Sequence, residues 1–143
     1  MSTEQNKNVI LRWRQGLNER NLNVIDDLFA PEYVGHITGV PGPVRGPVAF
    51  KQLFTAYLAA FDISVTPEFL IAEGTWWQCT MSIGSSTPVI SRGIPPTGKE
   101  LSVTSTDIYR IVDGKVVEQW FEADYTGMMQ QLSVLPSPRH VGS

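Results

Sequence analysis

The order of the sequence patterns predicts an α+β domain, in which N-terminal helices cover one face of a mostly antiparallel sheet. Apolar residues recur at helical spacing as far as residue 61. From residue 62 onward, β-rich segments are separated by glycine-containing turns of the kind that join hairpins. Helices followed by strands, rather than helices alternating with strands, are typical of the α+β class.

Length and composition are those of one small, weakly acidic domain. A chain of 143 residues buries roughly 68–70% of its unfolded surface, which is enough for a core with an internal pocket. The 11 Lys+Arg and 14 Asp+Glu give a net charge of −3, which argues against nucleic acid and anionic membranes as partners. The single cysteine excludes an intramolecular disulfide, and one cysteine with two histidines argues against a metal site.

We expect one domain over residues 1–143, with a mobile tail from about residue 134. No apolar run approaches the ~20 residues of a membrane span. The polar start MSTEQNKN does not have the pattern of a signal peptide. These observations predict a cytoplasmic protein without membrane partners.

Three helices are predicted in the first part of the chain. An S-x-x-Q capping box at residues 2–5 opens the first helix. Asn21 or Asn23 can cap a shorter second helix, which Pro31 ends. Pro47 suits the start of the third. The apolar faces consist of Val9, Ile10, Trp13 and Leu17, then Val24, Ile25, Leu28 and Phe29, then Phe50, Leu53, Phe54, Tyr57, Leu58 and Phe61.

The second part of the chain reads as a sheet built from hairpins. Gly74 and the pair Asp113-Gly114 supply the turns of two hairpins, and Asp124 can cap a final helical turn through Leu132. The predicted strands are residues 33–38, 63–73, 75–83, 88–91, 99–112 and 115–123.

Four segments of this sequence resemble the SnoaL-like polyketide cyclase family. They are LFAPEYVGH (28–36), GIPPTGKEL (93–101), DIYRIVDGKVVEQW (107–120) and DYTGMMQQL (124–132). The resemblance extends over residues 4–133 in the family's order. It implies the nuclear-transport-factor-2-like fold, a cone-shaped barrel of curved sheet closed by the N-terminal helices. It also implies an enzyme of natural-product biosynthesis that uses no cofactor and closes a ring on a hydrophobic, polyketide-like small molecule.

Two polar positions of the family are changed in this chain. The family's aldol cyclases use an aspartate on the last strand, three residues before the aspartate that corresponds to Asp124; here that position is Phe121. The histidine of a G-T-H segment is replaced within Gly84-Ser85-Ser86. We therefore expect shape-controlled cyclisation, of aldol or [4+2] type, with hydrogen bonds to a substrate carbonyl. The alternatives are a hydratase, isomerase or hydroxylase with Asp107 and His36 as acid and base, or a non-catalytic binding protein.

The last hairpin decides which residues share the pocket. A type I turn with a bulge at Gly114 would pair Asp107 with Gln119, whereas a two-residue type I′ turn would place Thr106 opposite Phe121. The bulged register is preferred, because the resemblance places Phe121 on the inner face. The predicted pocket face then carries Val103, Ser105, Asp107, Tyr109, Val117, Gln119 and Phe121.

Asp107, His36 and Tyr109 are the predicted catalytic residues. Burial would disfavour the charged form of Asp107 and suit it to acid/base work; the alternative is a solvated carboxylate paired with Arg110 or Arg92. The resemblance places His36 facing the pocket, where it can exchange a proton near neutral pH or only shape the pocket wall. The Tyr109 hydroxyl can donate to a substrate carbonyl. The predicted substrate-binding residues are Tyr33, Leu53, Tyr57, Ser105, Gln119 and Phe121.

The outer face of the sheet predicts a homodimer. Trp76 and Trp77 are adjacent on a strand, so only one of them can line the pocket. Trp120 precedes the inward Phe121 and should face outward with Ile108. Such an apolar surface is too large to stay wet on a stable monomer.

Overall fold

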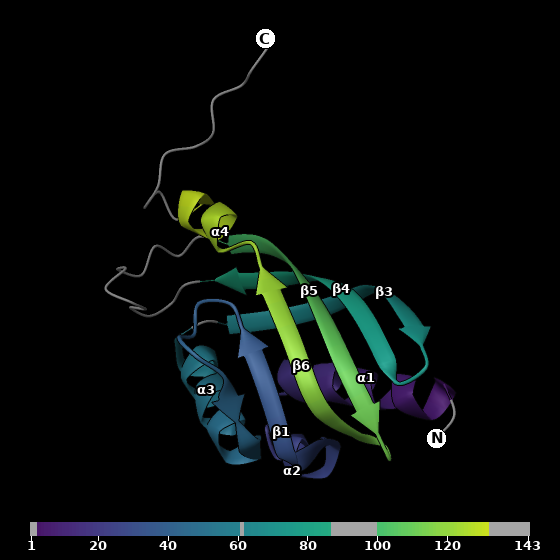
Figure 1. The fold of residues 1–143 in the computed structure, drawn as a ribbon. Helices are drawn as coiled ribbons and strands as arrows, with labels where there is room; N and C mark the ends of the chain where they lie inside the picture. The colour runs from purple at the N-terminus through teal and green to yellow at the C-terminus, as the bar shows by residue number, and fades with distance from the viewer. Residues whose placement is uncertain (1–2, 61, 87–99, 132–143) are drawn as a thin grey trace.

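The computed structural model describes residues 3–60, 62–86 and 100–131, and it confirms the α+β class (Figure 1). Within these ranges no helix is long and apolar enough to cross a membrane. The predicted strand at 88–91 and the predicted tail from residue 134 lie outside the described residues. The helices are α1 (Thr3–Asn18), α2 (Val24–Leu28), α3 (Gly46–Ala60) and α4 (Tyr125–Gln131). The strands are β1 (Phe29–Ile37), β2 (Val44–Arg45), β3 (Asp62–Glu73), β4 (Trp76–Ser86), β5 (Glu100–Val112) and β6 (Lys115–Ala123).

All the described strands form one six-stranded sheet in the order β2-β1-β6-β5-β4-β3. Every pair is antiparallel except β1 and β6, which run parallel. Helices α1, α2 and α3 lie together on one side of this sheet (Figure 1). The expected closed barrel is wrong for the described strands, because the edge strands β2 and β3 do not pair with each other. β2 is only two residues long, and α3 packs against both β1 and β3.

Aromatic rings from α1, α3 and β1 form the centre of the core. Trp13 is fully buried, and its ring centroid lies 5.4, 5.2 and 5.1 Å from those of Phe29, Phe50 and Phe54. Tyr33 packs on the same group, 5.0 Å from both Phe29 and Phe50. Burial of such a side chain contributes roughly 1.5–3 kcal/mol, and together these rings hold α1 and α3 against the sheet.

The last hairpin differs from the predicted one in its turn and in its bulge. Asp113 (φ 51°) and Gly114 (φ 74°) both have positive φ, which is the signature of a two-residue type I′ turn. The pairing then shifts between Arg110 and Ile111, because Val117 is an extra residue in β6. The bulge leaves the consecutive residues Val116 and Val117 both buried.

The combination of turn and bulge sets a new register. Asp107 stands directly opposite Phe121, and Gln119 stands opposite Tyr109. The preferred pairing of Asp107 with Gln119 is therefore wrong by two residues, and the alternative of Thr106 with Phe121 is wrong by one. A shift of two residues leaves every side chain on its predicted face, and the whole predicted pocket face is buried.

Candidate active site

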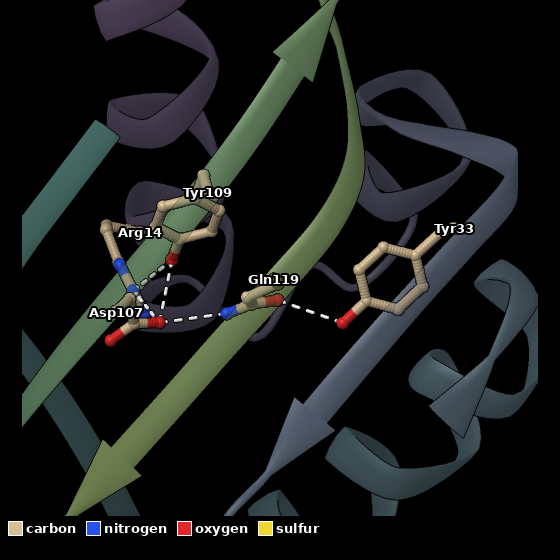
Figure 2. Close-up of polar contacts among 5 residues, drawn as sticks. All are labelled: Arg14, Tyr33, Asp107, Tyr109 and Gln119. Atoms are coloured by element: carbon tan, nitrogen blue, oxygen red, sulfur yellow. Dashed lines mark hydrogen bonds and ion pairs between the residues drawn. The ribbon is translucent and has the colours of Figure 1, made fainter. Parts of the chain in front are cut away.

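Five buried polar side chains meet between α1 and the inner face of the sheet (Figure 2). Each of them is 4% exposed or less. Asp107 and Tyr109 are two residues apart on β5 and so point to the same face. Gln119 comes from β6, Tyr33 from β1 and Arg14 from α1. The site thus joins three strands and a helix through side chains rather than through a loop.

Three donors converge on one oxygen of the Asp107 carboxylate. Arg14 Nη2, Gln119 Nε2 and Tyr109 Oη donate to Oδ2 at 2.6, 2.8 and 2.9 Å. Arg14 Nη2 also contacts the Tyr109 hydroxyl oxygen. The other carboxylate oxygen, Oδ1, is buried and has no hydrogen-bond partner among the described residues; Figure 2 shows it pointing away from the group. A buried acceptor without a donor costs about 1–3 kcal/mol.

Gln119 links Asp107 to Tyr33. The Tyr33 hydroxyl donates to Gln119 Oε1 at 2.9 Å, and the Nε2 end of the same amide donates to Asp107. Burial, together with the negative charge of Asp107, raises the pKa of Tyr33 well above its usual value. Tyr33 therefore remains a hydroxyl donor, and this contact fixes which end of the Gln119 amide faces the carboxylate.

This arrangement offers a proton acceptor rather than a carbonyl donor. An ion-paired carboxylate has acceptor sites only. The hydroxyl of Tyr109 donates to Asp107, and that of Tyr33 donates to Gln119. The described residues of the group thus leave Asp107 Oδ1 as the atom that can receive a proton from a bound molecule.

The remaining predicted residues fall into two places. Ser105 is buried two residues before Asp107 on the same face, and its Oγ has no partner in the described parts of the chain. Phe121 is buried opposite Asp107. Leu53 and Tyr57, both half-buried on α3, pack against the ring cluster rather than within the hydrogen-bonded group.

His36 does not join the site, so the predicted orientation toward the pocket is wrong. In a strand, residues three apart face opposite sides, and Tyr33 occupies the inner side. The His36 side chain is 42% exposed and contacts Glu118 at 2.9 Å on the outer face. Its ring stacks on Trp120, with centroids 5.3 Å apart.

Arg14 is the functional candidate that the sequence patterns did not identify. The signal was present: residue 14 is four residues after Ile10 and three before Leu17, so it lies within the apolar stripe of α1. A charged residue there needs a buried partner. Of the alternative partners considered for Asp107, Arg110 pairs with Glu118 on the outer face at 3.6 Å, and Arg92 lies outside the described residues.

A cleft of about 560 Å³ lies between the N-terminal half of α1 and the β3–β4 hairpin, and the described residues that line it include none of the five site side chains. Its lining includes Lys7, Leu11 and Trp77, and Trp77 is the cross-strand neighbour of Tyr109. Among the described residues, no group of three or more His, Cys, Asp or Glu side chains could hold a metal ion.

The outer face of the sheet carries a row of neighbouring side chains, one from each of five strands. The row consists of Ile71, Gln78, Ile108, Trp120 and His36. Trp76 lies beside it, 46% exposed and 5.4 Å from the Trp120 ring, whereas Trp77 is buried on the inner face. The prediction that the two adjacent tryptophans face opposite sides is confirmed.

Comparison with known proteins assigns the family. The family model for the SnoaL-like polyketide cyclases matches residues 7–132. This chain belongs to that family. It is 29% identical over 110 residues to the nogalonic acid methyl ester cyclase of Streptomyces nogalater, covering 76% of this chain and 82% of the relative. Membership supports an enzyme with a cyclase role in polyketide biosynthesis.

Solved structures show the same fold. IdmH from Streptomyces antibioticus, a candidate polyketide cyclase, superposes with a TM-score of 0.83 at 24% identity, over 90% of this chain and 99% of IdmH. AclR from Streptomyces galilaeus, a candidate hydroxylase, superposes with a TM-score of 0.85 at 24% identity, over 96% of this chain and 87% of AclR. A shared fold does not fix the reaction, so the reaction has to be argued from the site.

Proposed function

We propose that this protein is a cofactor-independent cyclase that closes a ring on a polyketide-derived substrate, with Asp107 Oδ1 as the proton acceptor. The observation that carries the proposal is the asymmetry of the Asp107 carboxylate. Three donors bind Oδ2, while Oδ1 is buried without a partner among the described residues. A positioned carboxylate of this kind is suited to general-base catalysis.

The reaction balances without an added reagent. Asp107 Oδ1 takes a proton from a carbon next to a substrate carbonyl, which leaves an enolate. The enolate carbon attacks a second carbonyl of the same molecule, so that a carbon–carbon bond forms and the ring closes. The resulting alkoxide takes the proton back and becomes a hydroxyl. The Arg14 guanidinium, 2.6 Å from Oδ2, compensates the charge of the carboxylate before the proton is taken and after it is returned.

The geometry favours this route over shape-controlled cyclisation in which Tyr109, Asp107 or His36 polarises a substrate carbonyl. That mechanism requires a donor aimed at the substrate, and the expected donors were Tyr109, Asp107 and His36. The Tyr109 hydroxyl donates to Asp107, Asp107 is an ion-paired acceptor, and His36 lies on the outer face. The same position of His36 disfavours a hydratase, isomerase or hydroxylase that would use Asp107 and His36 together.

The test uses nogalonic acid methyl ester, the compound in the name of the curated relative, as the probe substrate in deuterated water. Proton transfer to and from Asp107 predicts a cyclised product, with deuterium appearing next to the carbonyl of recovered starting material. Cyclisation without such exchange would support the shape-controlled mechanism instead. Saturable binding of the ester without conversion would support the non-catalytic alternative.

We also propose that the outer face of the sheet binds a second copy of the chain. Apart from Gln78, the row from Ile71 to His36, with Trp76 beside it, consists of aromatic and aliphatic side chains, and none of the helices α1, α2 and α3 covers it. Arg110 and Glu118 flank it with opposite charges. A two-fold interface brings one patch against itself, and a patch with both signs of charge is suited to such contact.

A further inference from the structure

The structure assigns a positioning role to Gly35: the absence of a side chain there lets the Tyr33 hydroxyl reach Gln119 and so fixes the orientation of the Asp107 carboxylate. This inference rests on the proposed function only in calling Asp107 the reacting group. The chain of contacts from Gly35 to Asp107 stands on geometry alone. It gives a role to a residue that carries no chemistry of its own.

First, the Tyr33 side chain occupies the space that a side chain at position 35 would need. A Cβ atom built on this glycine would overlap the Tyr33 hydroxyl oxygen and lie 2.9 Å from Tyr33 Cζ. Real Cβ atoms do not approach other atoms that closely. Gly35 does not have a positive φ, so its backbone conformation would accept alanine. The requirement for glycine here is therefore one of space.

The second step is that Tyr33 has little freedom to move aside. It is 1% exposed, and its ring packs on Phe29 and Phe50 at 5.0 Å. Such close-packed rings transmit a displacement rather than absorb it. A side chain at position 35 would therefore move the Tyr33 hydroxyl relative to Gln119.

The third step is the amide of Gln119, which stands opposite Gly35 across the parallel β1–β6 pair. Its Oε1 accepts from Tyr33 at 2.9 Å and its Nε2 donates to Asp107 at 2.8 Å. An amide can turn over by half a rotation, which exchanges its donor and its acceptor. Because the Tyr33 hydroxyl supplies a proton to Oε1, the NH₂ end is directed to Asp107 Oδ2.

The experiment reads the Gln119 amide directly, by NMR of the side-chain NH₂ group in the full chain. The resonances are assigned through their loss in Gln119→Glu. Tyr33→Phe and Gly35→Ala should each shift the same pair of Gln119 NH₂ resonances. In the Tyr33→Phe background, Gly35→Ala should cause little further shift, because the effects of substitutions within one network are not additive. Val34→Ala, the neighbouring position on the outer face of β1, is the matched control and should leave the pair in place.

The cyclisation assay supplies the second readout. Both variants should lower kcat by up to about 10²-fold with little change in KM, the loss that ångström-scale misplacement of a reacting group causes. Unmoved Gln119 resonances in both variants, or an equal shift in Val34→Ala, would overturn the positioning role. If the Gln119 resonances shift in both variants but the wild-type protein turns over no substrate, the positioning role stands and the proposed function is rejected. Wild-type kcat in Gly35→Ala and Tyr33→Phe, alongside a large loss in Asp107→Asn, would reject the positioning role alone.

Discussion

Asp107 and Phe121 stand directly opposite each other on β5 and β6, and both side chains face the helices. Directly opposed residues on one face have Cβ atoms about 4.5–5.5 Å apart. By the family resemblance, position 121 is where the aldol cyclases carry their acid/base aspartate. A carboxylate at position 107 therefore reaches the same region of the inner face from the adjoining strand.

Replacing Asp107 by asparagine should remove the proton acceptor while keeping the shape of the side chain. If the carboxylate is the general base, kcat should fall by the ~10²–10⁴-fold typical of acid/base catalysis. Steady-state kinetics across pH, with binding measured separately, checks this expectation. Asp113→Asn makes the same chemical change at the exposed hairpin turn and should leave kcat unchanged.

A swap of the carboxylate across the two strands sharpens the test. The double variant Asp107→Asn/Phe121→Asp should regain part of the activity lost in Asp107→Asn, because the new carboxylate lies opposite the old one. A modest loss in Asp107→Asn would contradict the proton-transfer mechanism and restore the shape-controlled one.

Arg14→Met should destabilise the fold strongly, because it leaves the Asp107 charge buried and uncompensated. Both partners are buried, at 4% and 0% exposure. Breaking a buried pair from one side costs about 3–5 kcal/mol, which denaturant unfolding can measure. In the Asp107→Asn background the same change should cost clearly less. Equal costs in the two backgrounds would show that the pair is not coupled.

The sequence predicted the fold and the inner face well because both depend on local periodicity. Alternation along β5 and β6 grouped Asp107, Tyr109 and Gln119 on one face, which the resemblance at Phe121 identified as the inner one and which is buried, and helical spacing identified the stripe that contains Trp13. The register of the last hairpin was not predictable in this way. It depends on the extra residue at Val117, a bulge that leaves no local turn signal.

The composition of the site was harder to predict, because it depends on distant contacts. Arg14 and Asp107 are 93 positions apart, and only the helix–sheet packing shows that they meet. His36 was placed inward by the resemblance, although it is three residues from Tyr33 and an unbroken strand places the two on opposite faces. Counting the alternation from Tyr33 would have corrected that prediction.

Tyr33 should make the fold sensitive to alkali. Its pKa is raised above the ordinary value of 10.0 by burial and by the Asp107 charge. The stabilisation this gives is fully present below the unfolded-state pKa and is lost as the pH rises above it, because the unfolded chain then releases a proton that the folded chain retains. The stability difference between wild type and Tyr33→Phe, measured by urea unfolding, should therefore shrink as the pH passes 10. A difference that stays constant with pH would contradict this reading.

Asn18 should stabilise the exposed edge of the sheet. Its side-chain amide pairs with both backbone groups of Val65 on edge strand β3: Nδ2 donates to the carbonyl at 2.9 Å, and Oδ1 accepts from the N–H at 2.7 Å. At about 0.5–1.5 kcal/mol per hydrogen bond, Asn18→Ala should cost about 1–3 kcal/mol in unfolding free energy. Asn8→Ala, exposed on the same helix, makes the same chemical change without removing a contact to β3 and should not destabilise. Equal effects of the two changes would mean that the contact to β3 contributes nothing.

The proposed self-association should depend on Trp120, which lies between Ile108 and His36 in the outer row. Trp120 stacks on His36 and lies 5.4 Å from Trp76, and large aromatic side chains of this kind dominate the energetics of interfaces. Light scattering at micromolar concentration should give about twice the chain mass of 15.9 kDa for the wild type. Trp120→Glu should give the mass of a single chain, because dimerisation would remove the new carboxylate from water. Val48→Glu places the same charge on an apolar residue that is 71% exposed on α3, away from the sheet face, and should remain dimeric. A wild-type mass of one chain would refute the dimer, and dissociation of Val48→Glu alone would relocate the interface to the helical side.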